Sequence, residues 1–252
     1  MAGKVYQNYV FDLYGTLVDI HTDEGAEELW EKLSLFYGYY GASYTPKELQ
    51  TAYEELVTGK EAMLKGRLSE EPRYAHESYP EIRLEEVFRE LYLAKGVEVE
   101  LDLAVHTGQF FRVMSTEYVR LYEGAKELLV SLRNTGAGVW LLSNAQRIFT
   151  AYELNYLGIA GYFDGIMISS DYNTKKPDLR FYEALFRKYG VCPEESLMIG
   201  NDARCDIEGA KAAGMDTFYI RSNLSPRDDV TPECTYCLEE MDLGRVAELL
   251  LQ

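Results

Sequence analysis

Short runs of apolar residues alternate with stretches of helical periodicity in two parts of the sequence. We expect short buried strands over residues 6–13, 138–143, 165–169, 196–200 and 216–220. Between them, apolar residues recur at helical spacing over residues 124–135, 147–157, 179–189 and 204–213. This alternation predicts an α/β fold with a Rossmann-like parallel sheet and right-handed crossovers.

Residues of about 19 to 118 break this rhythm. They carry four amphipathic patterns, near residues 25–38, 46–65, 83–95 and 103–121, and no strand is predicted among them. We therefore expect a core made of residues 1–18 and 119–252, with an inserted helical cap domain over 19–118. The loop over residues 66–82 has little apolar periodicity and is expected to be flexible or to face the substrate.

Composition limits the partners and the compartment. A chain of 252 residues with 47% hydrophobic content can bury one core and a smaller domain. The net charge of -17 argues against nucleic acid and against anionic membranes. No signal-peptide pattern or uncharged membrane-spanning run is visible, so we expect a cytoplasmic protein. We expect the four cysteines to be reduced, and the spacing of Cys234 and Cys237 is better explained by small core residues than by zinc.

Asp12 is the first candidate functional residue, because a predicted apolar strand delivers it into a glycine-containing turn. A carboxylate at the C-terminal end of a parallel strand lies in the crevice where open α/β sheets bind ligands, and there it can act as a nucleophile. The alternative is an aspartate that only accepts hydrogen bonds from the backbone of its turn.

Asp202 and Asp206 provide a second chemical signal. They are one helical turn apart and follow the strand predicted to end at Gly200. Two neighbouring carboxylates repel each other, and a cation relieves that repulsion. Together with Asp12 they form a hard oxygen site suited to Mg²⁺. Asp206 could instead cap its helix.

Four segments, in order along the chain, resemble the motifs of the haloacid-dehalogenase superfamily. The resemblance covers residues 1 to about 18 and about 119 to 221, whereas the inserted residues match only in being helical. It implies a hydrolase whose cap largely determines the substrate. The segments are Asp12-Leu13-Tyr14-Gly15-Thr16, Leu141-Leu142-Ser143-Asn144, Lys176-Pro177-Asp178 and the stretch from Ile199 to Ala210.

The resemblance also implies roles for the matching residues around the metal. Asp12 would be the nucleophile. The metal would be bound by Asp12, by the backbone carbonyl of Tyr14 and by Asp202. Asp206 would act on the metal through water, or would position Lys176.

Phosphoryl transfer requires donors that neutralise the charged oxygens. Ser143 could supply its hydroxyl and Asn144 its backbone amide, although Asn144 could instead only shape the turn. Lys176 is expected to supply the ammonium group, because it directly precedes Pro177 as in the family pattern. Lys175 is adjacent and could take its place.

Tyr14 departs from the phosphatases of this family, in which an aspartate at this position protonates the leaving oxygen and later activates water. A phenol, with a pKa of about 10, is a weak base in its neutral form, so hydrolysis of an aspartyl-phosphate should be slow. His21 could assist proton transfer in place of the missing aspartate.

Haloacid dehalogenases also have Asp-x-Tyr-Gly-Thr and use no metal, but they have a neutral residue in place of Asp202. They also normally have an arginine early in the cap, whereas here none lies between Tyr14 and Arg67, and Arg67 and Arg73 are expected to face solvent.

These observations favour an Mg²⁺-dependent phosphatase that acts on a small phosphorylated metabolite through an aspartyl-phosphate on Asp12. The first alternative is a metal-independent 2-haloacid dehalogenase. The second is a non-catalytic protein that binds a phosphate ligand, which the replacement of the usual acid by Tyr14 makes credible.

Overall fold

The computed structural model describes residues 4–74 and 78–251 and contains a parallel six-stranded sheet. The strand order is β5-β4-β1-β6-β7-β8, and every neighbouring pair is parallel. The five strands predicted from apolar runs are all present, which confirms the α/β fold. The bounds are β1 Asn8–Phe11, β4 Gly138–Ser143, β5 Gly165–Ile168, β6 Ser196–Gly200, β7 Asp216–Ile220 and β8 Tyr236–Leu238.

Helices cover both faces of this sheet. Tyr9 and Phe11 of β1 point to the face covered by α5, α6 and α9, whereas Val10 points to the face covered by α7 and α8. Leu243 and Val246 of α9 are buried, whereas Leu249 and Leu250 are only partly buried. The helices are α5 Ala125–Asn134, α6 Arg147–Tyr156, α7 Leu179–Tyr189, α8 Gly209–Ala212 and α9 Leu243–Leu250.

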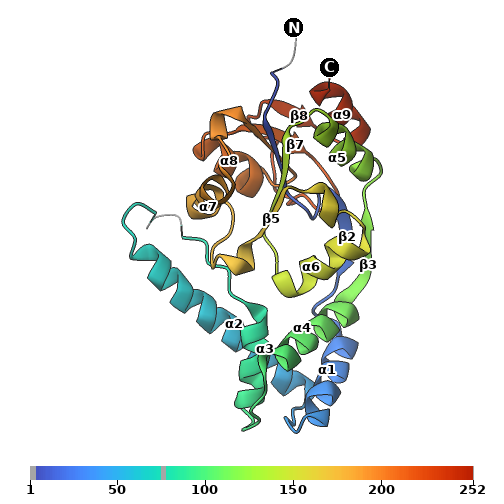
Figure 1. Ribbon diagram of the computed structural model, residues 1–252. Helices are drawn as coiled ribbons and strands as arrows, with labels where there is room; N and C mark the ends of the chain where they lie inside the picture. Colours follow the sequence, from blue (N-terminus) through green and yellow to red (C-terminus); the bar gives the residue numbers. More distant parts are fainter. Residues whose placement is uncertain (1–3, 75–77, 252) are drawn as a thin grey trace.

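Four further helices form a separate group below the sheet in Figure 1. They enclose a core of their own, in which Trp30, Phe88 and Phe111 pack together. Ile148 and Phe149 of α6 join that core, so α6 contacts both parts of the molecule. Among the described residues, no helix is both long enough and apolar enough to cross a membrane. The four helices are α1 Glu27–Tyr39, α2 Pro46–Ser69, α3 Leu84–Leu93 and α4 Leu101–Ser115.

Two strands that were not predicted connect these helices to the core (Figure 1). β2 (Val18–Thr22) pairs antiparallel with β3 (Thr116–Leu121), and the helix expected to reach residue 121 ends at Ser115. The pairing joins segments about a hundred residues apart in the sequence, so no local pattern indicates it. The division into core and cap stays a prediction, and both of its proposed boundaries fall within these strands.

The C-terminal part differs from expectation in two details. The helix predicted over residues 204–213 begins as a π-helical turn, Ala203–Glu208, and continues as α8. β8 was also not predicted. It carries Cys237, which is exposed, so the expectation that this cysteine is a core residue is wrong.

Candidate active site

The turn after β1 holds Asp12 at the edge of the sheet. The amide of Asp12 still donates to the Ile199 carbonyl of β6, at 3.0 Å. Gly15 then adopts a φ of 88°, and a Cβ at this position would lie 2.3 Å from Asn201 Nδ2. Only glycine allows both the backbone conformation and this close approach. Thr16 Oγ1 donates to Asn201 Oδ1 at 3.2 Å, which joins the first motif to the fourth.

Lys176 lies between two of the predicted carboxylates. Its Nζ is 2.7 Å from Asp12 Oδ1 and 2.7 Å from Asp206 Oδ1, and its side chain is only 1% exposed. Burial alone would lower the pKa of Lys176, but the two carboxylates raise it above its usual value. The ammonium group is therefore charged at neutral pH. Lys175 instead points to Glu81, at 3.7 Å, so only Lys176 of the two lysines joins this cluster.

Asn144 fixes the backbone of Lys176. Its Oδ1 accepts from the Lys176 amide at 2.8 Å, and its Nδ2 donates to the Lys176 carbonyl at 2.9 Å. The side chain of Asn144 is thus used within the protein, whereas its backbone amide, the group expected to hold the phosphate, takes no part in these two bonds. Ser143, at the end of β4, is fully buried, and its hydroxyl has no hydrogen-bond partner among the described residues. An unpaired buried hydroxyl is costly, and a ligand or an ordered water would satisfy it.

Asp202 and Asp206 both lie in the turn that follows β6. Asp202 Oδ1 accepts from the amides of Arg204 and Cys205, at 2.9 and 2.6 Å, and caps the helical turn. Asp206 Oδ2 accepts from the Asp202 amide at 3.0 Å. Asp12 and these two aspartates line one cavity of about 160 Å³. Its other lining residues are Tyr14, Asn144, Lys176, Asn201, Cys205, Leu224 and Pro226.

The oxygens around this cavity fit a hydrated divalent cation. In the part of the chain that the structure describes, no three His, Cys, Asp or Glu side chains could hold a metal ion alone. Mg²⁺, however, usually keeps several waters and takes only one or two carboxylates. Both oxygens of Asp206 are engaged, whereas Asp12 Oδ2 has only a 3.4 Å contact from Thr16 and no bond to Asp202 Oδ2 is recorded among the described residues. Asp12 and Asp202 are therefore the better ligands.

The buried cluster carries more negative than positive charge. Burial raises the pKa of Asp206 to about 7; Lys176 opposes this rise, and the charge of Asp12 adds to it. A carboxyl whose pKa is higher in the folded state than in the unfolded state stabilises the fold at low pH. That stability is lost as the pH rises through the folded pKa.

Thermal stability should therefore depend on pH and on Mg²⁺. Without divalent cations, we expect the Tm to fall as the pH rises from about 5 to about 7 and to level off above that, because the folded state keeps a proton on Asp206 that the unfolded state has released. Mg²⁺ should raise the Tm more at the higher pH, since it neutralises the same charge. Circular dichroism melts of the natural protein and of Asp206→Asn test this. An equal loss of Tm in Asp206→Asn would show that another group is responsible.

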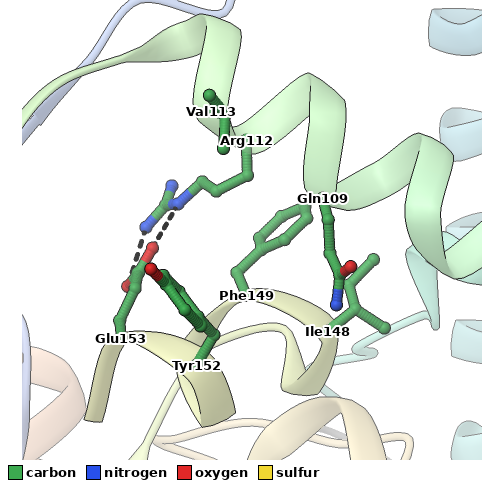
Figure 2. A pocket seen from close by; sticks show the side chains of 7 residues that line it. All are labelled: Gln109, Arg112, Val113, Ile148, Phe149, Tyr152 and Glu153. Atoms are coloured by element: carbon green, nitrogen blue, oxygen red, sulfur yellow. Dashed lines mark hydrogen bonds and ion pairs between the residues drawn. The ribbon is translucent and has the colours of Figure 1, made fainter. Parts of the chain in front are cut away.

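The phenol of Tyr14 is engaged away from this cluster. Its hydroxyl bonds to Glu153 of α6, which also accepts from Arg112 Nε of α4 at 2.7 Å. Thr150 Oγ1 lies 3.0 Å from the same hydroxyl. Burial and the Glu153 carboxylate raise the pKa of Tyr14 well above its usual value, so its phenol is protonated at neutral pH. Figure 2 shows the Arg112–Glu153 pair between the two helices.

Other sequence candidates lie outside the cavity. His21 is 53% exposed and faces Glu117 at 3.8 Å, so the structure does not place it where it could assist Asp12. Arg73 is largely exposed, as expected, and it also pairs with Glu183 at 2.6 Å. Arg67 is exposed as well.

Sequence reasoning missed four residues around the site. Thr16 and Asn201 stand inside the matching motifs and could have been found there. Glu153 and Arg112 reach Tyr14 from distant segments, and nothing local in the sequence indicates them.

Curated relatives with known activities match parts of the chain. It is 32% identical to a phosphoserine phosphatase of Thermus thermophilus over 50% of this chain and 49% of the relative. It is 31% identical to a glyceraldehyde 3-phosphate phosphatase of Methanothermobacter thermautotrophicus over 52% of this chain and 59% of the relative. The chain thus spans about half the length of these relatives.

Solved structures match nearly the whole chain. A 2-haloacid dehalogenase from Pseudomonas syringae pv. Tomato superposes with a TM-score of 0.60, at 20% identity, over 98% of this chain and 99% of that one. A phosphatase from Thermococcus onnurineus superposes with a TM-score of 0.57, at 18% identity, over 97% of each chain. At these identities the likeness concerns the fold alone.

The family of this chain is assigned from a family model that matches most of its sequence. A family model described as haloacid dehalogenase-like hydrolase matches residues 6–214. This range includes β1, the turn with Asp12, and the segments that carry Ser143, Lys176 and Asp206. The chain belongs to the haloacid dehalogenase-like hydrolases.

Proposed function

We propose that this protein is a magnesium-dependent phosphatase that acts on a small phosphomonoester through Asp12. The observation that carries the proposal is the buried cluster in which Lys176 bridges Asp12 and Asp206 beside a cavity that Asp202 also lines. The phosphatase names of the two curated relatives support the same chemistry.

In the first step, an oxygen of Asp12 attacks the phosphorus and an acyl phosphate forms. The bond to the leaving oxygen breaks, and that oxygen departs with the electron pair and then gains a proton. Lys176 lies 2.7 Å from Asp12, so its charge can stabilise the equatorial oxygens during transfer. Ser143 precedes Asn144, which lines the cavity, and we propose that its buried hydroxyl, without a partner among the described residues, donates to the same group.

Mg²⁺, when bound, supplies further neutralisation of the phosphoryl charge. We propose that Asp12, Asp202 and the backbone carbonyl of Tyr14 hold it. Asp206 keeps Lys176 in position, because its two oxygens already accept from Lys176 and from the Asp202 amide. Asn144 also keeps Lys176 in position, because its side chain bonds to the backbone amide and carbonyl of Lys176.

The cavity restricts the size of the substrate. Its volume is about 160 Å³. Leu224 and Pro226 line the cavity with apolar surface, which suits a short carbon chain.

The second step, hydrolysis of the acyl phosphate, should limit turnover. This step requires a base that activates water, and the protonated phenol of Tyr14 is a poor one. With p-nitrophenyl phosphate and Mg²⁺, we expect a rapid burst of about one p-nitrophenolate per protein, followed by a slower steady rate. Stopped-flow absorbance measures both phases. A linear time course without a burst would indicate that the first step is slower.

A phosphomonoester panel tests the proposed function as a whole. We expect turnover of p-nitrophenyl phosphate and of small phosphomonoesters with Mg²⁺, and none with EDTA. Asp12→Asn is the matched blank, since it keeps the size of the side chain. Silence toward all esters, with tight binding of a phosphate analogue, would favour a non-catalytic phosphate-binding protein.

A 2-haloacid dehalogenase remains the second candidate, because Tyr14 matches the first motif of those enzymes. Two observations weigh against it: Asp202 supplies a carboxylate where they have a neutral residue, and Arg112 is already paired with Glu153. Chloride release from 2-chloropropionate in EDTA, lost in Asp12→Asn, would support this alternative.

A further inference from the structure

Three side chains join the turn after Asp12 to the inserted helices. Tyr14 lies two residues after Asp12, Glu153 belongs to α6, and Arg112 belongs to α4. The Tyr14 hydroxyl donates to Glu153 Oε2, and Arg112 Nε donates to Glu153 Oε1 at 2.7 Å. The Arg112 guanidinium also lies 5.8 Å from the centre of the Tyr14 ring. We call these three residues the Arg112–Glu153–Tyr14 link.

The hydrogen bonds of the Tyr14 hydroxyl leave it no proton for a substrate. A phenol has one proton, and an ionised carboxylate can only accept, so this proton goes to Glu153. The Thr150 hydroxyl, 3.0 Å away, must then donate to the Tyr14 oxygen. Tyr14 could protonate a leaving oxygen only by breaking its bond to Glu153.

Burial makes the link strong. The side chain of Glu153 is 7% exposed and that of Arg112 is 16% exposed, so water screens their attraction little. Phe149 lies beside the pair, with its ring 5.2 Å from the Arg112 guanidinium. In Figure 2 these side chains line a pocket between α4 and α6. A displacement of α4 would therefore pull on Glu153 and, through it, on Tyr14.

We infer that Arg112, Glu153 and Tyr14 are positioning residues through which helix α4 sets the conformation of the turn that follows Asp12. Tyr14 thus acts through the placement of this turn and not as an acid. The consequence for turnover rests on the proposed function, whereas the consequence for the turn itself does not.

Hydrogen exchange measures the turn directly, without any activity. Gly15 and Leu17 hold it closed, because their amides donate to Val18 and Leu13, both at 2.8 Å. Arg112→Met should accelerate exchange of these two amides about tenfold, a typical coupling between linked residues, although Arg112 makes no recorded hydrogen bond with them among the described residues. If the single variant unfolds, the double variant Arg112→Met with Glu153→Gln takes its place, because it leaves no unpaired buried charge. We expect the same acceleration of exchange in it.

Arg83→Met is the matched control. It removes an arginine from another carboxylate that is little exposed, Glu85, within the inserted segment. We expect it to leave exchange of the turn unchanged. Equal exchange of Gly15 and Leu17 in the Arg112 variants and the natural protein would overturn the link. If Arg83→Met accelerated exchange of these two amides as much as Arg112→Met does, the link would be overturned as well.

A leaving-group comparison tests the role of Tyr14. If Tyr14 positions the turn, Tyr14→Phe should lower kcat/KM, which reports the first step, by the same factor for p-nitrophenyl phosphate and for an alkyl phosphate, and adding Arg112→Met should lower it little further. If Tyr14 is the acid, the alkyl phosphate should lose far more, because its leaving oxygen needs a proton. That larger loss would overturn the inference. If the natural protein turns over neither ester, the proposed function fails and the exchange result alone decides on the link.

Discussion

Asp12→Asn is expected to lower phosphatase turnover on the order of 10⁶-fold, the scale of loss seen when a nucleophile is removed. An amide oxygen cannot form the acyl phosphate on which the proposed reaction depends. Initial rates with p-nitrophenyl phosphate and Mg²⁺ measure this loss.

The same substitution should leave the fold intact. Lys176 keeps its ion pair with Asp206, and the cluster loses its excess negative charge. Urea unfolding should therefore give a free energy equal to or above that of the natural protein. If the Asp12→Asn protein is folded and still turns over at more than about one-hundredth of the natural rate, Asp12 is not the nucleophile.

Lys176→Met is expected to impair both stability and activity. It leaves Asp12 and Asp206 buried next to each other without a cation. Removing one partner of a buried ion pair typically costs about 3–5 kcal/mol in the free energy of unfolding. Turnover should fall as well, because the ammonium that stabilises the phosphoryl oxygens is gone.

The neighbouring lysine gives a matched control for this prediction. Lys175→Met removes a cation from a longer, partly exposed contact with Glu81, at 3.7 Å. We expect it to change the free energy of unfolding by no more than about 1 kcal/mol. Urea denaturation at neutral pH compares the two variants. Similar losses in both would mean that the buried cluster does not depend on Lys176.

The strands of the sheet could be predicted because each is buried on both faces and reads as a continuous apolar run. β8 and the β2–β3 pair could not. β8 has only three residues, and β2 and β3 pair across about a hundred residues of sequence, so neither shows a local pattern. Residues 116–121 were assigned to the preceding helix for the same reason: the strand partner that ends that helix lies far away in the sequence.

The site was predictable to the extent that strand ends define it. Asp12, Asp202 and Asp206 meet at one edge of the sheet because parallel strands place their carboxyl ends together. The individual roles of these residues depend on contacts that the sequence does not contain. Only the structure reveals that Lys176 lies between two carboxylates and that Glu153 accepts the hydrogen bond of the Tyr14 phenol.

The most direct test of the proposed chemistry is to locate the phosphoryl group on the protein during turnover. The protein is mixed with p-nitrophenyl phosphate and Mg²⁺, quenched in acid during the burst, digested and examined by mass spectrometry. We expect one phosphoryl group on the peptide that contains Asp12, absent with EDTA and absent in Asp12→Asn. Active protein that carries no phosphoryl group, or carries it on another residue, would rule out Asp12 as the nucleophile.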